Sequence, residues 1–188
     1  MGKLVVTEFV SLDGVMQAPG GEDFKYPGWT FEFDRGDDGN KFKLEEIMDA
    51  DAHLLGRKTY ESFAGAWPNR EGEFADRLNN DPKYVVSSTL KDPDWNNTTV
   101  IDGSGDVAGE VRKLKDRHDQ ILVAGSRRLV QELIENDLVD QFNLMVFPVV
   151  LGTGDKLFNE YSDKKDLKLV ESRTVGDDGV QIQIYTPA

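Results

Sequence analysis

The chain has 188 residues and carries 35 acidic against 22 basic side chains, a formal net charge of −13 at pH 7 that argues against a nucleic-acid-binding surface. It contains no cysteine, which excludes disulfides, thiol chemistry and a cysteine-ligated zinc site. No apolar run reaches the roughly 18 residues of a membrane span, and the first residues lack a secretory signal pattern. We therefore expect one cytoplasmic domain, residues 1–188, with no membrane partner.

The first predicted strand covers residues 3–10 and ends in a turn, Ser11-Leu12-Asp13-Gly14. Glycine at position 14 suits a turn with positive φ. Asp13 either points into a cleft or only caps the turn, as aspartate often does. Both interpretations remain open at this point.

Residues 17–40 predict a long loop, because turn residues recur throughout this segment. Its aromatic side chains either form a wall beside a heterocyclic ligand or anchor the loop to the core. Trp29 is the preferred candidate for the ligand cleft. The spacing of the apolar residues that follow predicts a helix, with Phe42, Leu44, Ile47 and Met48 on its buried side.

A second short strand is predicted at 51–56, and Gly56-Arg57-Lys58-Thr59 then begins a helix. Free amides, a hydroxyl and two cations at a helix N-terminus favour a phosphate group, and two adjacent cations are informative in so acidic a chain. We expect His53 to be structural and His118 to be exposed, and neither has partners that suggest a metal site.

The middle of the chain contains a surface segment at 64–81 with a short helix near 73–78, followed by a buried strand at 84–86. This strand ends in three hydroxyl residues, Ser87-Ser88-Thr89. A further strand at 98–101 and a helix at 106–117 follow.

The most informative stretch runs from 121 to 152 and predicts a β-α-β unit. Ile121 to Ala124 form a buried strand, and Gly125-Ser126 then offers a turn whose amides suit an anion. Leu129, Val130, Leu133 and Ile134 form one helical stripe. A long apolar strand is predicted from 139 to 151, closed by Gly152-Thr153-Gly154, and its uniform apolarity favours a sheet edge used in a homodimer.

The last two strands, 167–170 and 180–185, alternate apolar and polar residues around the turn at 176–179, which predicts a β-hairpin. The order of elements therefore predicts an α/β protein: a three-layer fold with a mostly parallel central sheet, helices on both faces and an antiparallel C-terminal hairpin.

Three motifs carry a family resemblance: the strand ending in Ser11-Leu12-Asp13-Gly14, the segment from Gly56 to Phe63, and the run from Val123 to Gly154. Together they resemble the dihydrofolate reductase-like superfamily, in the branch of the C-terminal reductase domain of bacterial riboflavin-biosynthesis deaminase-reductases. The resemblance covers nearly the whole chain and implies a dihydrofolate reductase-like fold.

The resemblance also implies a function, namely hydride transfer from NADPH to a planar nitrogen heterocycle or to a sugar imine attached to one. Either dihydrofolate or a riboflavin precursor of the phosphoribosylamino-uracil type fits as the substrate. The alternative is a non-catalytic, dimeric nucleotide-binding or stress-related protein on the same fold.

The implied site residues fall into three groups. The cofactor group is Gly56, Arg57, Lys58, Thr59, Ser87, Ser88, Thr89, Ala124, Gly125, Ser126, Arg127 and Leu129. The substrate group is Ser11, Trp29 and Gly152. Asp13 is the expected catalytic acid. The acidic residue that dihydrofolate reductases carry on their first helix has no secure counterpart among Glu32, Asp34, Glu45 and Glu46.

Overall fold

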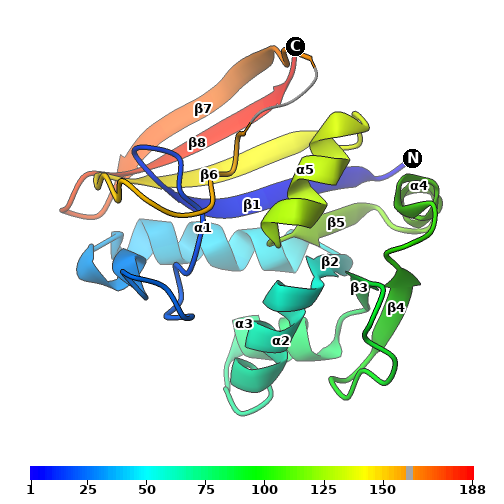
Figure 1. Cartoon of the computed structure of the whole chain (residues 1–188). Helices are drawn as coiled ribbons and strands as arrows, with labels where there is room; N and C mark the ends of the chain where they lie inside the picture. The colour runs from blue at the N-terminus through cyan, green and yellow to red at the C-terminus, as the bar shows by residue number, and fades with distance from the viewer. Residues whose placement is uncertain (160–162) are drawn as a thin grey trace.

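The computed structural model describes residues 1–159 and 163–188, which form an eight-stranded sheet with helices against both faces (Figure 1). The strands are β1 (Lys3–Ser11), β2 (Ala52–Gly56), β3 (Lys83–Ser87), β4 (Thr98–Asp102), β5 (Gln120–Val123), β6 (Gln141–Phe147), β7 (Leu167–Val175) and β8 (Val180–Pro187). The helices are η1 (Trp29–Glu32), α1 (Gly36–Asp49), α2 (Arg57–Ala66), α3 (Glu73–Asn80), α4 (Val107–Arg117) and α5 (Arg127–Glu135). None of these helices is long and apolar enough to span a bilayer.

The sheet has the order β4-β3-β2-β5-β1-β6-β8-β7. All pairings among β1 to β6 are parallel, whereas β8 is antiparallel to β6 and β7 is antiparallel to β8. This arrangement confirms the predicted mostly parallel sheet with an antiparallel C-terminal hairpin. Because β1, β2, β3 and β5 are parallel, their carboxyl ends lie at one edge, where open α/β sheets bind ligands.

Successive residues of one strand fill the two faces of the sheet. In β1, Leu4 and Val6 are buried in the cluster that includes the apolar residues of α4 and α5. Val5 instead packs with Ala50, the residue after α1, and with Leu122 of β5. This alternation follows from the strand period of two, and it gives each face its own core.

α1 begins earlier than its apolar pattern alone indicates. Its first residue is Gly36, inside a segment that we predicted as loop up to residue 40. Asp37 and Asp38 occupy the first turn, where the partial positive charge of a helix N-terminus stabilises carboxylates. Asp37 and Asp38, which we predicted as part of a loop, therefore lie in the first turn of the helix.

β6 is shorter than predicted and lies inside the sheet. It ends at Phe147, before Pro148, which has no N–H group to donate to a neighbouring strand. β1 pairs with it on one side and β8 on the other. The predicted apolar sheet edge at 139–150 is therefore wrong, because the chain's own strands cover this segment, and the edge strands are β4 and β7.

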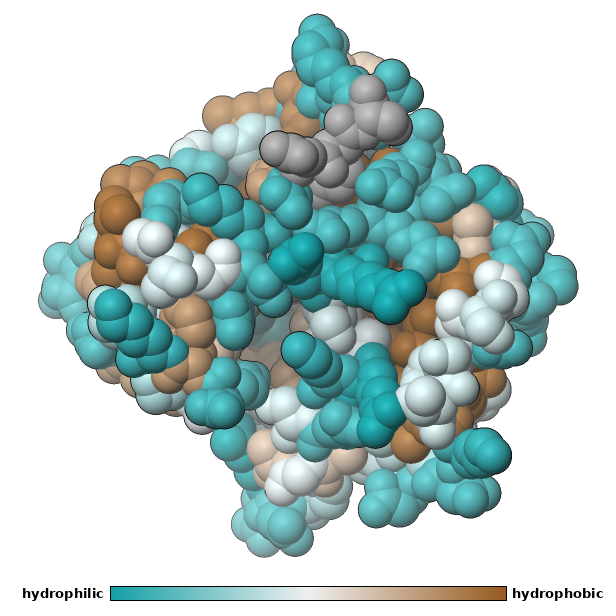
Figure 2. All heavy atoms as spheres, in the orientation of Figure 1, coloured by the Kyte–Doolittle hydropathy of each residue, from teal (hydrophilic) through white to brown (hydrophobic). Residues whose placement is uncertain are grey.

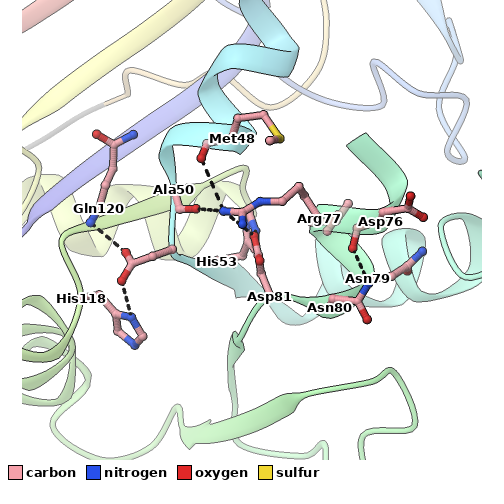
Figure 3. Close-up of polar contacts among 12 residues, drawn as sticks. Met48, Ala50, His53, Asp76, Arg77, Asn79, Asn80, Asp81, His118 and Gln120 are labelled. Carbon is pink, nitrogen blue, oxygen red and sulfur yellow. Dashed lines mark hydrogen bonds and ion pairs between the residues drawn. The ribbon is translucent and has the colours of Figure 1, made fainter. Parts of the chain in front are cut away.

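A polar cluster joins α1, β2 and α3 at the edge of the sheet where the parallel strands begin (Figure 3). Arg77 of α3 donates to the carbonyl oxygen of Ala50, beyond the end of α1, and lies 3.4 Å from a carboxylate oxygen of Asp81. The same oxygen lies 3.0 Å from Nε2 of the buried His53. These contacts hold three elements together and give His53 the structural role expected for it.

The expected exposure of His118 is wrong. Its side chain is only 13% exposed, with Nδ1 at 3.1 Å from a carboxylate oxygen of Asp51. Its Nε2 atom lies 2.9 Å from the hydroxyl of Tyr84. Both partners are remote in sequence, so the charged residues beside His118 gave no indication of them.

Candidate functional site

Two helices begin beside each other at the carboxyl edge of the sheet. β2 ends at Gly56, and β5 is followed by Gly125 and Ser126. The Gly56 amide donates to the Gly125 carbonyl at 3.0 Å, and the Thr59 amide and hydroxyl lie 3.4 and 3.3 Å from Oγ of Ser126. The first turns of α2 and α5 therefore lie in contact, and the amides at a helix N-terminus favour an anion such as a pyrophosphate.

Close packing explains why glycine occupies two of these positions. A Cβ on Gly56 would lie 2.3 Å from Oγ of Ser126, although the φ of Gly56 is ordinary at −77°. Gly125 has a φ of +104°, and a Cβ there would lie 2.7 Å from Oγ1 of Thr59. The peptide bond between Gly125 and Ser126 is cis. The two glycines thus allow the turns after β2 and β5 to pack in direct contact.

Hydroxyl groups from the end of β3 meet the start of α2. The guanidinium of Arg57 donates to the hydroxyl of Thr89 and also lies 2.7 Å from the carboxylate of Glu61. Ser87 is buried and its Oγ accepts two backbone amides of the residues after it, whereas Ser88 and Thr89 are exposed. An exposed arginine beside two exposed hydroxyls suits a phosphate monoester.

The other residues predicted to bind the cofactor have varied surroundings: one is ion-paired, two pack against apolar clusters and one is exposed. Arg127 forms an ion pair with Asp155 at 2.5 Å, so its charge already has a partner. Leu129 is buried in the core, and Ala124 packs against the apolar cluster around Trp95. Lys58 is exposed in the first turn of α2.

Asp13 is held by hydrogen bonds within its own turn and the 151–152 segment. The Ser11 hydroxyl donates to it at 2.6 Å, and the amides of Leu151 and Gly152 donate at 3.1 and 2.9 Å. These hydrogen bonds lower the pKa of Asp13 to about 2, and the bond from Ser11 has the largest effect. A carboxyl with so low a pKa is ionised at neutral pH and has no proton to give, which favours the turn-capping interpretation.

Trp29 is only 2% exposed. Its indole N–H donates to the carbonyl of Gln17 at 2.8 Å, and its ring packs edge-on against Phe147 with centroids 5.5 Å apart. These contacts fit the alternative in which the loop aromatics anchor the loop to the core, rather than a ligand-facing wall.

Glu8 is the acidic residue that the sequence pattern did not single out. Val6 of β1 pairs with Val123, the last residue of β5, so Glu8, two residues further on, lies beside Gly125. Its side chain is on the α5 side of the sheet, and a Cβ on Gly125 would lie 3.7 Å from its Oε1 atom. Within the described residues this Oε1 is buried and has no hydrogen-bond partner.

The protonation of Glu8 follows from its surroundings. Burial is the main cause that raises the pKa of Glu8 to about 8; Lys43 acts against this shift and the nearby Glu46 adds to it. At neutral pH the side chain is therefore mostly a neutral carboxylic acid. Such a group both donates and accepts a hydrogen bond.

The opposite face of the same strand end carries a fully bonded polar network. Lys43 of α1 lies 2.5 Å from Glu46 and donates to the Thr7 hydroxyl at 2.6 Å. Thr7 in turn donates to Glu46 at 3.0 Å, and Asn143 of β6 donates to the second Glu46 oxygen at 2.8 Å. The side chains of Lys43 and Glu46 are only 16% and 4% exposed. β1 thus carries polar groups on both sides at its carboxyl end.

The surface is hollowed between α2 and α5, on a face that is otherwise mostly hydrophilic (Figure 2). The two helix starts described above border this hollow. The position agrees with the general rule that open α/β sheets bind ligands outside the carboxyl ends of their parallel strands.

Comparison with known proteins identifies relatives along the whole chain. The uncharacterized protein YyaP of Bacillus subtilis is 28% identical over 186 residues, which cover 96% of this chain and 93% of YyaP. A structure from Shewanella sp. PV-4, provisionally assigned to riboflavin biosynthesis, superposes with a TM-score of 0.80 at 17% identity and covers 99% of both chains. The dihydrofolate reductase of Enterococcus faecalis, solved with NADP(H), gives a TM-score of 0.63 at 19% identity, with 99% of this chain and 96% of that chain covered.

These structural likenesses confirm the fold that the sequence resemblance implied. Residues 2–181 match the RibD C-terminal domain, which leaves Met1 and residues 182–188 outside the match. Because the match spans nearly all of the chain, this protein belongs to the RibD C-terminal domain family.

Proposed function

We propose that this protein is an NADPH-dependent reductase that acts on a C=N bond of a pterin-like or pyrimidine-type heterocycle, or on a ribosyl imine attached to one. The observation that supports it most directly is the meeting of three segments at one sheet edge: Gly56 to Thr59, Ser87 to Thr89, and Gly125-Ser126. Each offers amides, hydroxyls or a cation that suit a phosphate group.

The residues present fit a phosphorylated dinucleotide. The amides that begin α2 and α5 would hold the pyrophosphate, at the place where Gly56 and Gly125 allow the two helix starts to meet. Arg57, Ser88 and Thr89 would hold the phosphate on the adenosine ribose, which favours NADPH over NADH. NADPH supplies the hydride when bound, and the protein binds and orients the reactants and excludes water.

Binding of both nicotinamide cofactors tests the proposal before any substrate is known. NADPH and NADH are titrated against the protein by fluorescence, and we expect clearly tighter binding of NADPH. Equal affinities, or no binding of either, would contradict the cofactor assignment. Oxidation of NADPH is then followed by its absorbance with dihydrofolate, dihydropterins and ribosylamino-pyrimidines as candidate substrates. Tight binding without oxidation by any of these would favour the non-catalytic alternative.

We also propose a homodimer that forms through the edge strand β7 rather than through the 139–150 segment. The edge strand β7 exposes two apolar side chains, Leu169 at 50% and Val170 at 59%, and among the described residues it pairs with a strand on one side, β8. An edge of this kind readily pairs with another strand. Light scattering should show a dimer at micromolar concentration and a monomer for Val170→Glu, with Glu171→Gln as the control. A monomeric wild-type protein would contradict the proposal.

A further inference from the structure

The polar segments at the carboxyl edge follow one another in the order of the strands. Arg57 meets Thr89 where β3 and β2 end, and Gly56 meets Ser126 where β2 and β5 end. The next strand in the sheet is β1, which carries Glu8 beside Gly125. This inference rests on the proposed function, in which the 2′-phosphate of the dinucleotide lies at Arg57 and its pyrophosphate lies between the starts of α2 and α5. A dinucleotide bound in this way would direct its nicotinamide toward β1.

Glu8 differs from its neighbours because it is buried without being paired. Only 7% of the residue is exposed, and its Oε1 has no hydrogen-bond partner within residues 1–159 and 163–188. The charged groups that act on it from α1 are Lys43 and Glu46, and these are bonded to each other and to Thr7. A buried polar atom that lacks a partner costs stability and therefore calls for an explanation, such as a catalytic role.

We infer that Glu8 is the catalytic carboxyl of this protein, which faces the nicotinamide end of the cofactor and carries the proton used in reduction. Reduction of a C=N bond adds a hydride to carbon and a proton to nitrogen. Glu8 donates the proton, is left as a carboxylate, and regains a proton from solvent before the next turnover. Asp13, which is ionised and bonded within its turn, does not take this role.

This placement couples the ionisation of Glu8 to the redox state of the bound cofactor. The oxidised nicotinamide ring is positively charged, whereas the reduced ring is neutral. A positive charge within about 4–6 Å lowers the pKa of a carboxyl by roughly 1–3 units. NADP⁺ binding should therefore release a proton from Glu8, and NADPH binding should not. Both cofactors carry the same 2′-phosphate, whose own ionisation cancels in the comparison.

Calorimetric titration in buffers of different ionisation enthalpy measures the protons released on binding, without any turnover. In the wild-type protein the affinity for NADP⁺ relative to NADPH should rise about tenfold or more as the pH passes from well below 8 to well above it. In Glu8→Gln the ratio should not change with pH. Glu110→Gln, which alters an exposed carboxylate of α4 in the same way, should behave as the wild type.

The outcomes separate the inference from the proposed function. If both cofactors bind but wild type and Glu8→Gln show the same pH dependence, the inference is overturned while the cofactor assignment stands. If neither cofactor binds to the wild-type protein, both are overturned. If Glu8→Gln does not fold, proton release by the wild-type protein alone tests the inference. An equal release of protons on binding of NADP⁺ and NADPH would exclude a carboxyl at the nicotinamide.

Discussion

The hydroxyl of Ser126 lies 3.3 Å from the hydroxyl of Thr59, although the two residues are 67 positions apart in the chain. This contact brings the first turns of α2 and α5 together at the edge of the sheet. Any change that separates the two turns should weaken phosphate binding without touching the sheet core.

Gly56→Ala should separate the first turns of α2 and α5. The new Cβ would lie 2.3 Å from Oγ of Ser126 and 2.8 Å from its nitrogen, so the turn must shift. We expect a loss of about 1–3 kcal/mol in the free energy of unfolding, together with weaker NADPH binding. Gly65→Ala in α2 is the matched control, because a Cβ there meets nothing within 4 Å and alanine favours a helix by roughly 0.5–1 kcal/mol. Urea unfolding and cofactor titration of both variants decide the matter, and unchanged binding in Gly56→Ala would contradict it.

Arg57→Ala should weaken NADPH binding by ~1–3 kcal/mol and leave NADH binding nearly unchanged, because only NADPH carries the 2′-phosphate. The arginine is shared with Glu61, so part of its charge is already compensated. Arg112→Ala, which removes an exposed arginine from α4, controls for the loss of a positive charge in an acidic protein. Equal weakening of both cofactors by Arg57→Ala would show that Arg57 does not select the phosphate.

Lys43→Met should destabilise the protein by about 3–5 kcal/mol, because Glu46 is only 4% exposed and would lose its charged partner. The same substitution at Lys41, whose pair with Glu45 is 70% and 55% exposed, should change stability by less than about 1 kcal/mol. Chemical denaturation of the two variants measures the difference. Similar costs at both positions would mean that the buried network contributes no more than a surface ion pair.

Asp13→Asn distinguishes the two interpretations of that residue. An asparagine cannot accept the three hydrogen bonds equally well, so we expect lower stability by about 1 kcal/mol and unchanged NADPH affinity. The wild-type advantage should be present at neutral pH and disappear as the pH falls from 3.8 through about 2, because the folded-state pKa is lowered. Full stability with a large loss of turnover would instead support catalysis by Asp13.

Glu8→Gln should change how stability depends on pH. The pKa of Glu8 is raised from 4.5 to about 8, so the wild-type protein binds a proton that the unfolded chain has released. Its stability relative to Glu8→Gln should therefore be greatest below 4.5 and fall as the pH rises through about 8. Thermal unfolding across this range measures the difference, and parallel curves would show that Glu8 is not buried as described.

The sequence predicted the sheet and the turns after β2 and β5 because these depend on local patterns. The apolar run Ile121 to Val123 and the following Gly125-Ser126 indicate a buried strand and a turn without reference to the rest of the chain. The turns meet because parallel strands end at the same edge, a consequence of topology that the order of elements already implies.

Glu8 and the Thr7 network could not be found in this way. Alternation assigns Thr7 and Glu8 to opposite faces but does not say what covers each face. Lys43 and Glu46 resemble an ordinary surface pair of a helix, and only the approach of Asn143, 97 positions further along the chain, shows that the pair is buried. The prediction of a sheet edge at 139–150 was wrong for a similar reason, because β8, from the end of the chain, pairs with this segment.

β1 presents Thr7 toward α1 and Glu8 toward α5 within two consecutive residues. Both environments therefore depend on the same strand register, and insertion of a single residue ahead of them would exchange the two faces. The carboxyl of Glu8 would then take the place of Phe9, whose ring lies under Lys43, and a threonine would lie beside Gly125. Length changes in this strand should thus be far more damaging than most substitutions in it, which makes the spacing between Lys3 and Ser11 part of the site itself.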